Sequence, residues 1–253
     1  MCLWGRPRTI GGVNGSQVST GSLPDADDLP EGEEKARAVR VMFDAIAPRY
    51  DLINRIMTFR MDVRWRRRTV AALRLPARST VLDLACGTGD LCRELSAAGH
   101  QPIGVDLSFG MLAAARTDAP LIHGDILRLP VQDSAADGAT CGFALRNLVD
   151  LPTFFAELAR VVRPGGRIAL LEVAEPPNPL LRRGHQVYFG AVVPRIGGLL
   201  SDQAAYRYLP KSVAYLPPTA VMLDQLGDAG FIPVDRTLLS GGISQLVCGT
   251  RAR

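Results

Sequence analysis

The chain of 253 residues is 47% hydrophobic and 21% charged, and its formal net charge is +4 at pH 7. These values are typical of a soluble globular protein with one sizeable core, so we expect one domain with additions. The positive charge is compatible with an anionic partner surface but is too small to demand one.

Cysteine and histidine usage argues against a secreted or metal-binding protein. The five cysteines form no CxxC pair, and neither they nor the three histidines have the spacing of metal ligands. The first residues lack the apolar core of a signal peptide, and no window approaches the roughly 18 apolar residues of a membrane span. We therefore expect a cytoplasmic protein with reduced thiols and no metal, which could still touch a membrane surface.

The first part of the chain differs from the rest in composition. Residues 1–36 are rich in Gly, Ser, Pro and Asp, and they end in the acidic run LPEGEE. They show no apolar periodicity, so we expect a flexible tail. Residues 37–253 are expected to form the folded domain.

The folded domain opens with a helical pattern. The apolar residues that recur at spacings of four and seven are Met42, Ile46, Ile53 and Met57. Pro48 interrupts this pattern, and a second helix is expected over residues 63–73. We interpret residues 37–74 as a cap element, because they precede the first strand.

Strands and helices then alternate. The expected strands are TVLDLA, QPIGVDLS, APLIHGDI, DGATCGFAL and GRIALLEV, and the helices between them are DLCRELSAAG, FGMLAAART and LPTFFAELARVV. Such alternation predicts βαβ units and a mostly parallel sheet. Residues 175–215 break the rhythm and are expected to form a second cap element. A helix, AVMLDQLGDAGF, and two strands, FIPVDRTLL and ISQLVCGT, complete the chain.

This order indicates an α/β fold with a seven-stranded, mostly parallel sheet and a helical cap. A seven-stranded sheet with a closing hairpin is typical of the Rossmann-like class I S-adenosylmethionine-dependent methyltransferases. The segment VLDLACGTGDL, residues 81–91, runs from a strand into a glycine-rich turn. It lacks the third glycine of the dinucleotide motif, where Cys92 stands, and the lysine of a P-loop. S-adenosylmethionine suits this turn, since it contains an adenosine but no phosphate.

Polar residues at strand ends complete the predicted cofactor pocket. The glycines of the Gly87-Thr88-Gly89 turn let backbone amides approach a ligand closely. Asp106 ends the second strand and suits the two hydroxyls of a ribose. Asp125 ends the third strand, where it could accept from an adenine amino group.

Asp83 lies inside the first strand, where an unpaired carboxylate would be costly. We expect it to meet the amides of the turn or the ammonium group of the methionine moiety. The alternative for the whole pocket is a glycine turn that only reverses the chain, with acids on the surface. Acids at two successive strand ends favour the cofactor site.

Several longer segments narrow the assignment to a family. They are MFDAIAPRYDLINRIMTF, LDLACGTGD, FALRNLVD, LARVVRPGGRIALLE, VVPRIGGLLSD with AAYRYLPKS, and AGF. On these segments the chain resembles the ubiquinone/menaquinone biosynthesis C-methyltransferases from about residue 39 to residue 250. The glycine loop and the RPGG turn are generic to methyltransferases, whereas the other segments are specific in combination.

The resemblance implies methyl transfer from S-adenosylmethionine to a ring carbon of a prenylated quinol, with demethylmenaquinol as the expected substrate. It also implies cofactor contacts at Thr88, Asp106 and the Asp125–Ile126 pair. A further contact in this family is often a serine, and here that position is Gly142. The change removes a hydroxyl, so only a backbone contact could remain.

FALRNLVD follows the fourth strand and carries Arg146 and Asn147 to the expected position of the methyl donor. Methylation of an aromatic carbon needs an electron-rich ring, and arginine is a poor base because it stays protonated. We therefore assign Arg146 to electrostatic stabilisation of a phenolate and Asn147 to orientation of a hydroxyl or water. The alternative is that Arg146 pairs with Asp150 while Asn147 caps the next helix.

Tyr50 resembles a residue at the pocket entrance and could hydrogen-bond the quinol; its alternative role is packing in the cap. Apolar residues of the second cap element could line a tunnel for the isoprenoid tail. They are Tyr188, Phe189, Val192, Val193, Ile196, Leu199 and Leu200. The run RMDVRWRRR could attract anionic lipid headgroups at a membrane surface, or it could be a solvated helix face.

Other functions stay open on the sequence alone. A benzoquinol of the ubiquinone pathway or another phenolic ring could replace the naphthoquinol, and a non-enzymatic binding protein could keep the fold. A nucleic-acid partner is not expected, because ALRN stands where amino-methyltransferases of nucleic acids carry an Asn/Asp-Pro-Pro-aromatic loop. The sequence does not indicate an oligomeric state.

Overall fold

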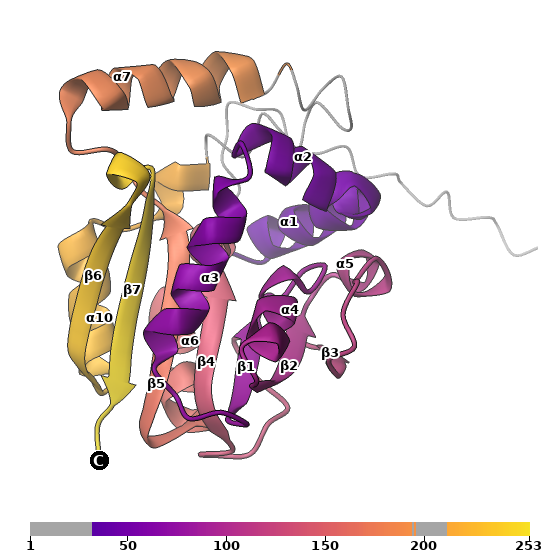
Figure 1. Cartoon of the computed structure of the whole chain (residues 1–253), viewed down its shortest axis with the longest axis vertical. Helices are drawn as coiled ribbons and strands as arrows, with labels where there is room; N and C mark the ends of the chain where they lie inside the picture. Colours follow the sequence, from indigo (N-terminus) through magenta and orange to yellow (C-terminus); the bar gives the residue numbers. More distant parts are fainter. Residues whose placement is uncertain (1–31, 194, 196–211) are drawn as a thin grey trace, which may run out of the picture.

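A seven-stranded sheet forms the centre of the computed structural model, which describes residues 32–193, 195 and 212–253 (Figure 1). Its strand order is β3-β2-β1-β4-β5-β7-β6. The strands are β1 (Thr80–Leu84), β2 (Gln101–Asp106), β3 (Leu121–His123), β4 (Ala136–Gly142), β5 (Val162–Val173), β6 (Phe231–Leu239) and β7 (Ser244–Arg251).

The first five strands are parallel, and β7 runs antiparallel to both of its neighbours, β5 and β6. Helices connect β1 to β2, β2 to β3 and β4 to β5, whereas residues 124–135 connect β3 to β4 without a helix. A short turn, η5 (Ser240–Gly242), joins β6 to β7. The predicted α/β class, the seven strands and the closing hairpin are therefore confirmed.

Helices cover both faces of the sheet. On one face lie α3 (Met61–Leu73) and α4 (Asp90–Ala97), whose buried side chains share a core with β1, β5 and β7. On the other face lie α6 (Leu151–Val161) and α10 (Thr219–Asp228), which pack on a larger core around Phe154 and Phe155. A short helix, α5 (Phe109–Ala113), follows β2.

The cap lies beyond the carboxyl ends of the parallel strands (Figure 1). It comprises α1 (Gly32–Ile46), η1 (Ala47–Arg49) and α2 (Tyr50–Met57), and further α7 (Pro179–Val187) with the π-helical turn η3 (Tyr188–Val192). The four predicted apolar residues of the first cap element are all buried in one cluster with Val193. The Tyr188 hydroxyl donates to the carbonyl of Met57 at 2.8 Å, which ties the two parts of the cap together.

Three predicted boundaries need correction. Residues 32–36 belong to α1 and not to a tail, since Lys35 is buried and donates to the carbonyl of Leu148 at 2.8 Å. The predicted helix over 63–73 packs on the sheet and not in the cap, because Trp65, Val70 and Leu73 belong to the core under β1 and β5. The helix after β2 ends at Ala113, four residues before the predicted end at Thr117.

Candidate functional site

The glycine-rich turn after β1 has the open backbone that was predicted. Gly87 and Gly89 have φ angles of +55° and +82°, in the left-handed region that favours glycine. A Cβ atom at Gly89 would lie 2.6 Å from Cγ2 of Thr117, whereas one at Gly87 would meet nothing within 4 Å. Open space therefore lies beside Gly87, where a ligand could approach the backbone.

Asp106 lies against this turn from the end of β2. Its two carboxylate oxygens accept from the backbone amides of Gly87 at 2.7 Å and Ser108 at 2.8 Å. Burial raises the pKa of the Asp106 carboxyl, and these two amides oppose part of the rise. A carboxylate oxygen can accept more than one bond, so Asp106 beside open Gly87 fits a ligand that carries a diol.

Thr88, between the two glycines, points to the cap. Its hydroxyl donates to Oδ1 of Asp51 at 2.5 Å, and both side chains are buried. Asp51 belongs to the first turn of α2, directly after Tyr50. The predicted cofactor turn and the predicted entrance tyrosine are therefore joined through a residue that the sequence analysis did not single out.

Asp83 is buried but does not meet the amides of the turn, so that part of the prediction is wrong. Thr140 Oγ1 donates to its Oδ1 at 2.9 Å, and Cys92 Sγ lies 3.3 Å from its Oδ2. Both partners come from neighbouring buried elements, β4 and α4, because a side chain in mid-strand projects from the sheet face. Burial raises the pKa of the Asp83 carboxyl to about 6.

Asp125 and Ile126 lie just beyond β3, which ends at His123 and not at the predicted aspartate. The Asp125 side chain is exposed and accepts from the backbone amide of Leu127 at 2.9 Å, within its own turn. Ile126 is buried in the core against α6, so only its backbone is free to reach a ligand.

Gly142 is the last residue of β4, next to the site. A Cβ atom there would lie 2.9 Å from Cδ1 of Leu91 on α4. A serine at this position would therefore require a shift of the end of the Leu91 side chain, with no backbone atom in the way.

Arg146 and Asn147 lie in η2 (Leu145–Asn147), directly beyond the end of β4, and both are buried. The guanidinium of Arg146 forms an ion pair with Glu172 at the end of β5. It also donates from Nη1 to the carbonyl of Phe143 at 2.9 Å and from Nε to Ser212 Oγ at 3.1 Å.

The alternative roles of this segment are contradicted. Arg146 pairs with Glu172 and not with Asp150, and Asp150 itself caps α6 by accepting from the backbone amide of Thr153 at 2.9 Å. Asn147 is therefore not the capping residue of that helix.

Tyr50 begins α2 and is half-buried, with its ring 5.9 Å from the ring of Phe43 in an edge-on arrangement. Burial raises the pKa of its phenol, while the charges of Arg66 and Arg146 oppose part of that rise. Tyr50 therefore remains protonated at neutral pH.

Arginines and acids tie the cap to the turn. Arg66 pairs with Asp62 and, at 3.2 Å, with Asp90 at the start of α4. Arg93 pairs with Asp90 and lies 3.9 Å from Asp51. These ion pairs link α2, α3 and α4 at the carboxyl edge of the sheet. We call them the ion-pair network, and its members are Asp51, Asp62, Arg66, Asp90 and Arg93.

The network changes the interpretation of the arginine-rich run. Arg66 is buried in ion pairs, and buried Trp65 donates its Nε1 proton to Ser240 Oγ at 2.9 Å. Neither can contact a headgroup. Arg60, Arg64, Arg67 and Arg68 are exposed, although Arg67 also contacts Glu94.

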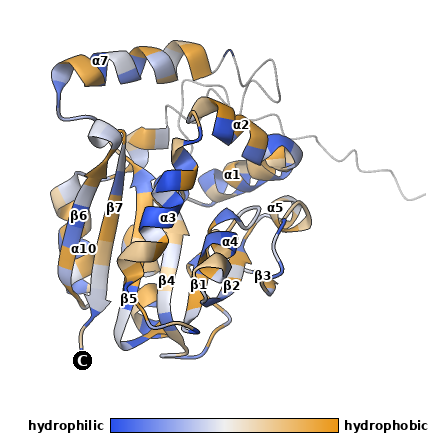
Figure 2. Ribbon diagram, viewed as in Figure 1, coloured by the Kyte–Doolittle hydropathy of each residue, from blue (hydrophilic) through white to orange (hydrophobic). Residues whose placement is uncertain are grey.

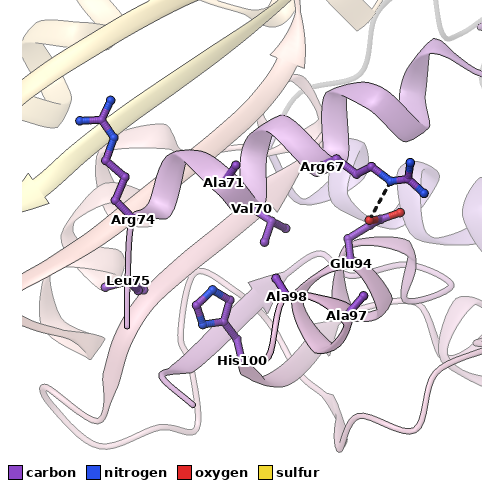
Figure 3. Close-up of a pocket in the computed structure, with 9 residues that line it drawn as sticks. All are labelled: Arg67, Val70, Ala71, Arg74, Leu75, Glu94, Ala97, Ala98 and His100. Carbon is purple, nitrogen blue, oxygen red and sulfur yellow. Dashed lines mark hydrogen bonds and ion pairs between the residues drawn. The ribbon is translucent and has the colours of Figure 1, made fainter. Parts of the chain in front are cut away.

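A separate surface hollow lies between the C-terminal halves of α3 and α4 (Figure 3). Its walls include Arg67, Arg74, Glu94 and His100. Because α4 begins at the glycine turn and the hollow lies at its other end, these residues are not part of the candidate site.

Of the predicted tunnel residues, Ile196, Leu199 and Leu200 lie outside the described part of the chain.

Three residues of the site were missed by sequence reasoning: Asp51, Glu172 and Ser212. Glu172 could have been found, because it is a lone acid at the end of the apolar strand IALLEV, the same signal that identified Asp106. Asp51 reads as an ordinary acid in a first helical turn, and Ser212 carries no signal. Among the described residues, no cluster of three or more His, Cys, Asp or Glu could hold a metal ion.

Comparison with known proteins identifies the family to which this chain belongs. Residues 31–251 match the model of the ubiE/COQ5 methyltransferase family. The chain belongs to this family. The resemblance inferred from its motifs is therefore confirmed, and with it the assignment of the chain to a family of methyltransferase enzymes.

Two similar relatives show how far the family likeness extends. The ubiquinone/menaquinone biosynthesis C-methyltransferase UbiE of Syntrophotalea carbinolica is 41% identical over 84% of this chain and 94% of its own length. The demethylmenaquinone methyltransferase of Thermus thermophilus is also 41% identical, over 83% of this chain and 100% of its own length.

Solved structures support the fold at lower identity. A SAM-dependent methyltransferase from Thermotoga maritima covers 84% of this chain and 99% of its own, with a TM-score of 0.59 and 18% identity. The phosphoethanolamine N-methyltransferase 2 of Haemonchus contortus, solved with S-adenosyl-L-methionine, covers 74% of this chain and 53% of its own, with a TM-score of 0.54 and 13% identity. At these identities the likeness establishes the Rossmann-like fold alone.

Proposed function

We propose that this member of the family transfers a methyl group from S-adenosylmethionine to a ring carbon of a prenylated quinol, with demethylmenaquinol as the substrate. The observation that carries the proposal is the buried arginine Arg146, which its ion pair with Glu172 holds just beyond the end of β4, at the strand edge that also carries Asp106. The names of the relatives at 41% identity point to the same chemistry.

Asp106 is proposed to accept from the ribose hydroxyls, and the open backbone at Gly87 to take the methionine part. Thr88 and Asp51 would border the same ligand, and Gly89 would give the turn its shape. Asp83 would lie beneath the turn and support it, with its carboxyl either protonated or ionised. Asp125, Ile126 and Gly142 would border the adenine, the last two through their backbones. When bound, S-adenosylmethionine supplies a methyl group attached to a positively charged sulfur.

The acceptor ring must be electron-rich, which an ionised hydroxyl achieves best. Arg146 stays protonated and is proposed to stabilise the oxyanion of the ring. Tyr50, whose pKa is raised, is proposed to donate a hydrogen bond to the quinol at the entrance, and Asn147 to orient the reacting hydroxyl. The ring carbon would gain the methyl group as the bond from that group to sulfur breaks, and the sulfur would keep the electron pair and leave as a neutral thioether. The proton of the ring carbon would pass to water, which restores the aromatic ring.

The substrate assignment is tested by competition between two quinols. The enzyme is incubated with S-adenosylmethionine and equal amounts of reduced demethylmenaquinone and the corresponding demethylated benzoquinol, matched in tail length. We expect the naphthoquinol product to dominate in mass spectrometry. A dominant benzoquinol product would reassign the substrate, and no quinol product with normal cofactor binding would point to another phenolic ring.

We further propose that the cap meets an anionic membrane surface, where a prenylated substrate resides. The helix α2 and the following turn expose Leu52, Ile56 and Phe59, and α7 exposes Leu180, Leu181 and Val187. Both lie at the same end of the molecule, and the hydropathy colouring shows apolar residues along α7 (Figure 2). Arg60 and Arg183 are exposed beside them. No helix in the described residues is long and apolar enough to cross a bilayer.

Vesicle co-sedimentation tests this surface. We expect binding to vesicles that contain phosphatidylglycerol, weaker binding to pure phosphatidylcholine, and loss of binding in the Leu180→Ser/Leu181→Ser variant. Val221→Ser on α10, which removes another exposed apolar side chain, should bind like the wild type. Equal loss in both variants, or no binding by the wild type, would contradict the proposal.

A further inference from the structure

We propose that Glu172 is a positioning residue that orients Arg146 toward the oxyanion of the substrate. This inference rests on the proposed function, because it assumes that Arg146 faces a ring hydroxyl. Glu172 would not touch the substrate itself but would act through the guanidinium.

Glu172 lies at the carboxyl end of β5, where its side chain is 1% exposed. Its carboxylate pairs with Nη1 of Arg146 and also accepts from the backbone amide of Arg146 at 3.3 Å. A third bond, from the backbone amide of Val173 at 2.8 Å, fixes the carboxylate itself. One acid thus holds both the main chain and the side chain of the arginine.

Among the described residues, the remaining contacts of Arg146 involve only Nη1 and Nε of its guanidinium. Nη1 also donates to Phe143, and Nε donates to Ser212. Within the described residues no hydrogen bond is made by Nη2. Because the guanidinium is planar, fixing Nη1 and Nε fixes the direction of the two Nη2 protons, which are the donors that remain for an oxyanion.

The energetics of a buried pair favour a functional reason for Glu172. Removing two charges from water is costly, and packed apolar residues often stabilise a core at least as well as a buried ion pair. Neighbouring positions of β5 carry such residues, Leu170 and Leu171, both fully buried. The orientation of a charged donor therefore explains a glutamate at position 172 better than stabilisation of the strand does.

A double-mutant cycle separates positioning from a general structural role. If Glu172 acts only through Arg146, replacing it should have no further effect once Arg146 is gone. If it merely supports the fold, the two losses should multiply. Glu172→Gln, Arg146→Gln and the double variant form this cycle, and Ser212→Ala tests the second anchor without leaving a buried charge unpaired.

The cycle needs a binding readout as well as turnover. The probe is 2-hydroxy-1,4-naphthoquinone, which is an anion at neutral pH and resembles the ionised ring; its neutral 2-methoxy counterpart is the control. We expect Arg146→Gln and Glu172→Gln each to weaken anion binding about tenfold, which corresponds to about 1.4 kcal/mol. Ser212→Ala should weaken it less, and the neutral probe should be unaffected.

In turnover, Glu172→Gln should lower kcat about ten- to a hundredfold with little change in the KM for the quinol or the Kd for S-adenosylmethionine. Neither the Glu172 nor the Ser212 substitution should reduce kcat or anion binding further in the Arg146→Gln background. Thermal unfolding of each variant shows whether it is folded; if Glu172→Gln is not, the Ser212→Ala cycle decides.

Two outcomes would overturn the inference. One is a Glu172→Gln variant that binds the anion and turns over like the wild type while Arg146→Gln does not. The other is losses that multiply in the double variants. A wild type that binds the anion through Arg146 but methylates no quinol would instead refute the proposed function, while the binding cycle would still decide the role of Glu172.

Discussion

Single residues at the carboxyl edge show where sequence reasoning succeeds. Asp106 could be placed from its position after an apolar strand, because the ends of parallel strands meet at one edge. The partners of Asp83 could not be, since Thr140 and Cys92 approach it from β4 and α4 only after the sheet has formed. The ion pair of Arg146 was not predictable for the same reason: the alternative role considered for Arg146 paired it with a near neighbour in sequence, Asp150, whereas its partner Glu172 lies 26 positions away.

The raised pKa of Asp83 predicts a pH-dependent stability. Its carboxyl has a folded-state pKa of about 6, above the unfolded value, so its contribution to stability is complete at low pH and is lost as the pH rises through 6. Asp83→Asn should therefore gain stability relative to the wild type between pH 4.5 and 7.5, by about 2 kcal/mol. Urea unfolding at the two pH values measures this, and a difference that stays constant would contradict the buried, raised carboxyl.

At the scale of elements, the periodicity of two and 3.6 residues identified the strands and the main helices of the described chain. It could not say which face α3 covers. The run RMDVRWRRR looks like a solvated or headgroup-binding helix, yet Asp62 and Arg66 neutralise one another inside it and Trp65 turns to the sheet. Tertiary pairing of a buried arginine is not visible in a linear pattern of charges.

The ion-pair network predicts unequal effects along α3. Arg66→Ala would leave Asp62 buried without its cation and Asp90 with one partner fewer, so it should lower the free energy of unfolding by about 3 kcal/mol. Arg68→Ala, on the exposed face of the same helix, should change it by less than about 0.5 kcal/mol. Chemical denaturation measures the free energy of unfolding of both variants. An effect of Arg66→Ala as small as that of Arg68→Ala would show that the network contributes no stability.

For the molecule as a whole, the order of elements was enough to predict the sheet, because chain order and right-handed crossovers leave few topologies. The cofactor pocket at its carboxyl edge stays a prediction. The coupling of cap and pocket through Asp51 and Thr88 was not predictable, since it joins residues 37 positions apart. If the glycine turn binds the cofactor as proposed, this contact makes the first cap element part of that site. Ligand binding should therefore stabilise the cap and the sheet together.

Cofactor binding should be visible as one cooperative shift in thermal unfolding. S-adenosylmethionine at a hundred times its Kd should add about 2.7 kcal/mol to the free energy of unfolding. Asp106→Asn keeps an acceptor for the Gly87 amide but loses charge and acceptor capacity for the ribose, so its shift should be much smaller at the same ligand concentration. A full shift in this variant would remove Asp106 from the cofactor site.

Tracing the methyl group itself tests the proposed reaction. The wild-type enzyme is given S-adenosylmethionine with a carbon-13-labelled methyl group and reduced demethylmenaquinone in detergent, and the product is examined by NMR. We predict that the label appears as a methyl group on a ring carbon and that Arg146→Gln lowers its rate of appearance strongly. A label on oxygen, or a quinol left unlabelled by an enzyme that binds the cofactor, would contradict the assignment.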